Sequence, residues 1–187
     1  MSEPFDQIEY CLWAAGQRDD ASLRELCRHL AASDWRVQFA AAVALGDRAD
    51  RRALEPLLEL LAAEDAAPLY TQQADLGGAP AGSPDERELA FPPGTTGATR
   101  AAWERRGRLK QAVCLALGAI AVTDQRALDA LHRHATDQRE DYPVRAAAAK
   151  ALGQLHSPAS RAALTLATQD PEWCTATEAR QALAGLG

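Results

Sequence analysis

The sequence predicts an all-α fold in which helix pairs stack into a solenoid. The triplet Ala-Leu-Gly recurs at 44–46, 116–118 and 151–153, each time at the end of an alanine-rich run with helical spacing. A polar turn and a second apolar run follow each triplet. Because one amphipathic pair cannot bury its own apolar face, such repeats have to stack on one another.

The first helix of each unit ends in the triplet. Apolar residues lead into Gly46 at Val37, Ala40 and Ala41, and the run that leads into Gly153 has the same pattern. Small residues on this face allow helices to approach closely. We expect the glycine itself to end the helix in a left-handed cap.

The second helix of each unit begins at a capping residue. Asp50 and Ser157 come four residues after their glycines, and Asp124 comes two residues later in its own unit. A leucine follows each cap after seven residues. These leucines are Leu57, Leu131 and Leu164.

The repeat extends to both ends of the chain. Near the N-terminus, Gly16, Asp20 and Cys27 take the positions of the glycine, the cap and the leucine. At the C-terminus, residues 173–184 repeat the first helix alone. The sequence therefore predicts four helix pairs plus a terminal helix.

Residues 35–46 and 142–153, with the turn Ser157-Pro158-Ala159-Ser160, resemble HEAT repeats of the short type named after phycobilisome lyases. The resemblance implies a right-handed α-α superhelix, an armadillo-like helical fold whose second helices line a concave face. It also implies a binding scaffold, since the family mostly supplies such scaffolds.

We interpret residues 1–187 as a single domain with a loop inserted at about 66–99. Gly118 follows Gly46 after 72 residues, whereas Gly153 follows Gly118 after 35. The segment 66–99 holds five of the ten prolines and shows no helical periodicity. Such a loop is usually functional or disordered. The alternative is a loop fastened to the solenoid by its apolar residues Leu69, Tyr70, Leu89 and Phe91.

The net charge and the apolar segments of the sequence lead to expectations about partners and location. The net charge is −6, with −6 on residues 1–65, −3 on 66–99 and +3 on 100–187. An acidic chain is a poor candidate for binding nucleic acid. The difference in charge between its two ends allows weak end-to-end self-association. The first residues show no secretory leader, and the longest apolar run is about half of a membrane span. We expect a cytoplasmic protein without a membrane partner.

The cysteines and histidines predict no catalytic residue, cofactor or metal. Cys11, Cys27 and Cys114 occupy core positions of the repeat, so packing is favoured over a reactive thiol or chromophore attachment. His132 and His134 lie two residues apart on a helix and point to different sides. HEAT-repeat hydroxylases that bind two irons use His-Glu dipeptides, and this sequence has none.

A basic run follows the inserted loop and opens a helix. An aromatic residue among arginines can stack on a base or bind an anion. The alternative interpretation is an exposed, salt-bridged helix face. The run consists of Arg100, Trp103, Arg105, Arg106, Arg108 and Lys110.

The function that the sequence favours is a non-catalytic scaffold for another protein or peptide. The partner would bind the concave face and the inserted loop, because a rigid surface lowers the ordering cost of binding. One alternative is a lyase-like or accessory protein that acts on a bilin, and another is a HEAT protein that binds nucleic acid. The predicted contact residues are Arg24, Arg28, Glu55, Glu59, Asp129, His132 and Arg133.

Overall fold

The computed structural model describes residues 3–66 and 97–186, and within these ranges the regular structure is entirely helical. Two short 3-10 turns, η1 (Arg51–Ala53) and η3 (Pro158–Ser160), lead into α4 and α9. The helices are α1 (Pro4–Ala15), α2 (Asp20–His29), α3 (Trp35–Arg48), α4 (Leu54–Ala66), α6 (Gly97–Ile120), α7 (Gln125–Thr136), α8 (Tyr142–Gln154), α9 (Arg161–Ala167) and α10 (Trp173–Gly185).

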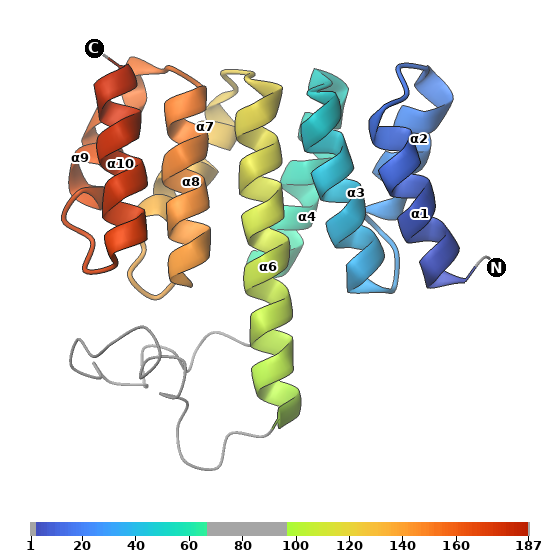
Figure 1. The fold of residues 1–187 in the computed structure, drawn as a ribbon. Coiled ribbons are helices and arrows are strands. Elements are labelled where there is room, and N and C mark those ends of the chain that lie inside the picture. Colours follow the sequence, from blue (N-terminus) through green and yellow to red (C-terminus); the bar gives the residue numbers. More distant parts are fainter. Residues whose placement is uncertain (1–2, 67–96, 187) are drawn as a thin grey trace.

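The helices lie in two rows (Figure 1). The first helices α1, α3, α6, α8 and α10 stand side by side, and each packs against the next. The second helices α2, α4, α7 and α9 form the row behind them. The predicted all-α solenoid, with four pairs and a terminal helix, is therefore confirmed for the described residues.

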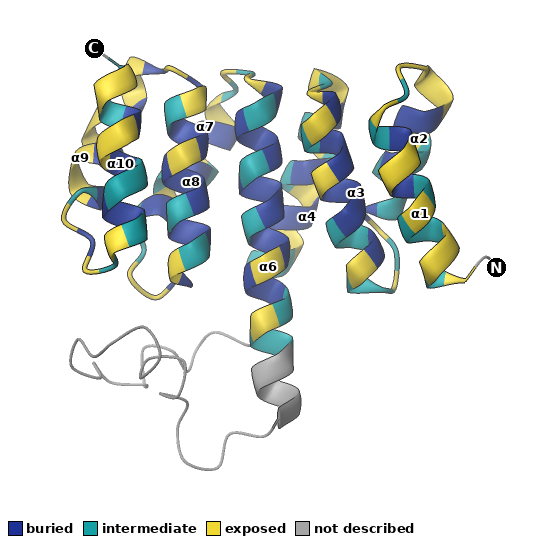
Figure 2. Cartoon of the chain, in the orientation of Figure 1, coloured by how far each residue is buried: buried dark blue, intermediate teal, exposed yellow. Residues whose placement is uncertain are grey.

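Leucines form the contacts between the two rows. Leu45, Leu117 and Leu152 of the triplets are at most 1% exposed, and Leu57, Leu131 and Leu164 of the second helices are fully buried. Buried and exposed residues alternate around the helices, as amphipathic packing requires (Figure 2). Cys11 and Cys114 lie in this core, as their repeat positions predict.

The glycines of the triplets lie inside their helices, so the prediction that they end them is wrong. Helix α3 continues past Gly46 to Arg48. The left-handed residue comes three positions after the glycine in each unit. These residues are Ala49 (φ 52°), Ala121 (φ 54°) and His156 (φ 48°).

Close packing between neighbouring first helices explains the glycines. A Cβ atom on Gly46 would lie 3.1 Å from Cα of Ala116, and one on Gly118 would lie 2.7 Å from Cα of Ala151. A Cβ atom on Gly153 would lie 2.7 Å from Cβ of Ala182. Gly46 and Gly118 thus each face the alanine of the next Ala-Leu-Gly triplet. Gly153 faces Ala182, which holds the same place in α10.

We expect Gly118→Ala to lower the free energy of unfolding by about 1–3 kcal/mol, because α6 and α8 must separate to admit the methyl group. This holds even though alanine favours the helix by about 1 kcal/mol. Urea denaturation of Gly118→Ala and Gly16→Ala measures the effect. Gly16 is the matched control, because its Cβ would meet only the Trp13 carbonyl oxygen, at 3.7 Å. Equal stability of Gly118→Ala and wild type would contradict this packing.

In the N-terminal unit, the capping residue and the buried leucine both come one residue earlier than predicted. Asp19, and not Asp20, caps α2 by accepting a hydrogen bond from the Ser22 amide. Leu26 is fully buried in the position assigned to Cys27, which is half-buried. The turn between α1 and α2 is shorter by one residue, so the spacing of seven between cap and leucine is kept.

Helix α6 is longer than the other first helices. It has 24 residues, against 12–14 in the others, and its N-terminal part projects beyond the row (Figure 1). The loop predicted at about 66–99 begins and ends within helices, since Ala66 belongs to α4 and residues 97–99 belong to α6. The rest of that loop, 67–96, lies outside the described residues. None of the described helices is long and apolar enough to cross a membrane.

Candidate functional site

The seven predicted contact residues come from three consecutive second helices, and we call them the second-helix face. Six of them are exposed. His132 is half-buried, and its ring lies 3.2 Å from the Ser160 hydroxyl. The face comprises Arg24 and Arg28 on α2, Glu55 and Glu59 on α4, and Asp129, His132 and Arg133 on α7.

Ion pairs connect the second helices across the repeats. Arg126 of α7 lies 2.8 Å from Glu55 of α4, and Arg133 of α7 lies 2.5 Å from Asp65 of α4. Arg52 of η1 lies 2.7 Å from Asp20 of α2. Exposed ion pairs contribute little to stability. Of the face residues, Glu55 and Arg133 take part in these pairs, which hold their side chains in place.

The local sequence Asp-x-Arg orients two of these arginines, Arg52 and Arg126. Asp50 accepts hydrogen bonds from the Arg52 amide and guanidinium, and Asp124 does the same for Arg126. These bonds lower the pKa of Asp50 to about 2 and also lower that of Asp124. Because the capping aspartate holds the arginine two residues later, the guanidinium reaches the preceding repeat in a fixed direction.

The basic run on α6 is not an exposed face. Arg106 and Lys110 are buried, Trp103 and Arg105 are half-buried, and only Arg108 is exposed among the described side chains. The side chain of Arg100 lies outside the described residues. Arg106 donates to the Glu64 carbonyl oxygen, and its Nε lies 3.5 Å from the Glu64 carboxylate. Helix α4 covers this part of α6, so the run is divided between the interior and the surface.

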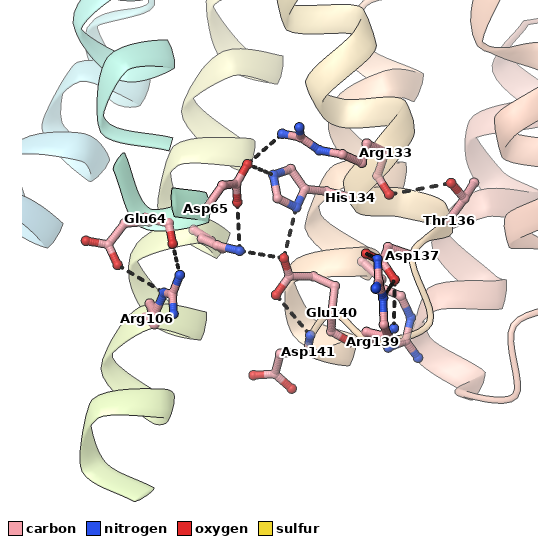
Figure 3. A network of polar contacts seen from close by, with 12 residues as sticks. Glu64, Asp65, Arg106, Arg133, His134, Thr136, Asp137, Arg139, Glu140 and Asp141 are labelled. Carbon is pink, nitrogen blue, oxygen red and sulfur yellow. Dashed lines mark hydrogen bonds and ion pairs between the residues drawn. The ribbon is translucent and has the colours of Figure 1, made fainter. Parts of the chain in front are cut away.

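Lys110 is the centre of a largely buried polar cluster, the Asp65 network, which also contains Asp65, His134 and Glu140. Figure 3 shows these last three side chains close together. The Lys110 Nζ lies 2.8 Å from Asp65 Oδ1 and 2.7 Å from Glu140 Oε2. The His134 Nδ1 lies 3.0 Å from the same Glu140 oxygen, and its Nε2 lies 3.3 Å from Asp65 Oδ2. The network joins α4, α6, α7 and the turn before α8.

The charges of the network shift the pKa of each acid and base within it. Burial raises the pKa of Asp65 and Glu140, but hydrogen bonds and charges from His134 and Lys110 outweigh it and hold both below their usual range. Burial lowers the pKa of His134, but the two carboxylates raise it above its ordinary value of 6.5. Beside the network, burial and the charge of Glu140 raise the pKa of Asp141 to about 7.

The network contains a group of three side chains of the kinds that bind metals. Asp65, His134 and Glu140 each offer one ligand atom, and these atoms lie within 4.8 Å of one another. However, the Lys110 ammonium lies between the two carboxylates. When His134 is protonated, its charge and that of Lys110 balance the two carboxylates. The arrangement therefore fits an ion-pair network better than a metal centre.

A second cluster resembles a nucleophile with its base. The Cys11 Sγ lies 3.3 Å from His29 Nδ1, and His29 Nε2 lies 3.5 Å from Glu25. Cys11 is fully buried, and burial raises the pKa of its thiol to about 11. The burial of the sulfur and the raised pKa of its thiol favour packing over a nucleophilic role for this triad.

Sequence reasoning missed both clusters because their members come from different helices. Asp65 and Lys110 lie on opposite sides of residues 67–96, and Glu140 lies 30 residues after Lys110. A signal was present at Lys110, which occupies the repeat position of the buried Arg145. A charged residue in a core-facing position of a repeat predicts a buried partner.

Comparison with known proteins points to one family. A family model described as HEAT repeats matches residues 6–74 and 103–184. A solved structure of human deoxyhypusine hydroxylase in complex with glycerol is similar, with 19% identity and a TM-score of 0.40 over 99% of this chain and 80% of that one. No curated protein matches this chain.

Proposed function

The chain belongs to the HEAT-repeat family, and we propose that it is a non-catalytic scaffold that binds another protein on its second-helix face. The observation that carries this proposal is the set of ion pairs that cross from one second helix to the next. Arg52–Asp20, Arg126–Glu55 and Arg133–Asp65 hold charged side chains of three repeats in one arrangement. A surface that is ordered before binding loses less conformational freedom when a partner docks.

The chemistry of the face fits a partner that carries both signs of charge. Arg24 and Glu59 are exposed, and neither makes an ion pair within the described residues. They are thus available to pair with an acid and a base of the partner. Arginine is also among the residues enriched at protein interfaces.

The structure gives less support to the other functions that the sequence left open. An anion at the basic run of α6 would need Arg106 and Lys110, but Lys110 pairs with Asp65 and Glu140, and Arg106 lies against Glu64. The family match is to HEAT repeats in general. The phycobilisome-lyase type, a bilin ligand and the cytoplasmic location stay predictions from the sequence.

Charge reversal on the face tests the proposal. The variant Arg24→Glu/Glu59→Lys changes two unpaired residues of the face and keeps the net charge. The matched control Glu9→Lys/Lys150→Glu makes the same changes at exposed residues of the first helices α1 and α8. Proteins captured by the full-length chain are identified by mass spectrometry, purified, and titrated by calorimetry against both variants and wild type.

We expect the face variant to weaken binding of the purified partner at least about tenfold, or about 1.4 kcal/mol, and the control to bind as wild type does. Equal binding by the face variant and wild type would place the interface elsewhere. A chain that binds no purified candidate would refute the scaffold role.

A further inference from the structure

One oxygen atom of Asp65 is shared between a buried and an exposed side chain (Figure 3). Arg133 donates a hydrogen bond to Asp65 Oδ2 at 2.5 Å, and His134 Nε2 lies 3.3 Å from the same oxygen. Lys110 occupies the other oxygen, Oδ1. Arg133 is largely exposed and belongs to the second-helix face, whereas His134 is buried.

The charged groups around His134 come from α4, α6, α7 itself and the turn before α8. Helix α4 provides Asp65, and α6 provides Lys110. The turn before α8 provides Glu140, which binds His134 Nδ1, and Asp137, whose charge is also close. Arg133 is the neighbour on α7 itself. Asp141 and Arg145 lie one contact further out, against Glu140.

The protonation state of His134 changes what its Nε2 offers to Asp65. A protonated imidazole carries hydrogen on both nitrogens, so that Nδ1 serves Glu140 and Nε2 can donate to Oδ2. In the neutral form with the proton on Nδ1, the Nε2 lone pair faces Oδ2, and only Arg133 can satisfy that oxygen. The oxygen can accept both bonds, but the two cations then share one negative charge and repel each other, so protonation of His134 weakens the pairing of Arg133 with Asp65.

We propose that Asp65 transmits the protonation of the buried His134 to Arg133, so that acidification frees this arginine for an anionic group of the partner protein. The link to a partner rests on the proposed function, whereas the coupling between the two residues does not. The raised pKa of His134 sets the direction. Protonation is complete only well below this raised pKa, and it is lost as pH rises through it.

Linkage is reciprocal, so the coupling can be measured without a partner. If protonation of His134 weakens the bond between Arg133 and Asp65, removal of Arg133 must make protonation of His134 easier. The experiment follows the ring protons of His134 by NMR from pH 5 to pH 9 in wild type and in Arg133→Gln. The matched control is Arg126→Gln, an exposed arginine of the same helix that pairs with Glu55.

We expect a His134 midpoint above pH 6.5 in wild type, an upward shift on the order of half a pH unit in Arg133→Gln, and no shift in Arg126→Gln. His132, whose pKa burial lowers, should keep its midpoint in all three proteins and so report an intact fold. Arg133→Lys should restore much of the wild-type midpoint.

An unchanged or lowered His134 midpoint in Arg133→Gln would overturn the coupling, as would a wild-type midpoint at or below 6.5. A confirmed shift together with pH-independent binding of a purified partner would keep the coupling and refute its role in binding. Failure of the scaffold proposal would leave the NMR result unaffected, so the two failures are distinguishable.

Discussion

Replacing Lys110 with alanine is expected to lower the free energy of unfolding by about 3–5 kcal/mol, the cost of breaking a buried ion pair by removing one partner. The Lys110 ammonium is the shared cation of Asp65 and Glu140, at 2.8 and 2.7 Å. Its loss leaves two carboxylates close together in a region that excludes water. Because both carboxylates are less than a quarter exposed, solvent screens their repulsion only weakly.

The loss should depend on pH in a defined direction. Lys110 helps to keep the pKa of Asp65 and Glu140 low, so its contribution is present at neutral pH and disappears as the carboxylates take up protons. The difference between Lys110→Ala and wild type should therefore shrink as pH falls below about 4. Chemical denaturation at a series of pH values gives this profile.

Two further variants separate charge from packing. Lys110→Met keeps the apolar stem, and we expect it to lose most of the stability that Lys110→Ala loses. Lys150→Ala removes an exposed lysine of α8 and should change the stability little. If Lys110→Met were as stable as wild type, the ion pairs would not stabilise the fold, and the assignment of Lys110 as a needed cation would be wrong.

Replacing Leu152 with alanine is expected to cost about 2–5 kcal/mol, because the side chain is fully buried between the two rows of helices. Part of the cost is lost burial, and the rest is the cavity that the rigid neighbours cannot fill. Leu45 and Leu117 hold the same place in their units, and alanine there should act similarly. Thermal and urea unfolding give the size of each effect.

Leu166 provides the matched control for this substitution. It lies on α9 but is 61% exposed, so Leu166→Ala removes the same atoms from the surface. We expect a small change there, within about 0.5 kcal/mol. Similar costs at Leu152 and Leu166 would contradict the burial pattern on which the repeat frame is based.

The helix pairs could be predicted because the determinants are local and periodic. The seven-residue spacing from Asp50 to Leu57 recurs at Asp124 and Leu131, and both leucines are fully buried. The role of Gly46 could not be predicted in the same way, since its reason is Ala116 on another helix. A glycine near the end of an apolar run has two explanations, a cap or a close contact, and the sequence alone favoured the wrong one.

The candidate site was predicted in part for a similar reason. The exposure of Arg24, Glu59 and Arg133 follows from helical spacing, because polar residues opposite an apolar stripe face solvent. The burial of Lys110 depends on Asp65 and Glu140, which are distant in sequence. Periodicity shows which side of a helix faces the core, but not which partner allows a charge to be there.

The contact of Gly46 with Ala116 bears on how the chain tolerates the long stretch of sequence between these two residues. About twice as many residues separate Gly46 from Ala116 as separate Gly118 from Ala151, the corresponding contact of the next pair of helices. In a flexible chain, doubling the loop length adds only about 0.6 kcal/mol of closure entropy. The Asp65 network bridges the same two parts of the chain, and removal of one of its charged partners would cost about 3–5 kcal/mol, several times that amount. The added length is therefore a small cost, and the stacking order of the helices is kept.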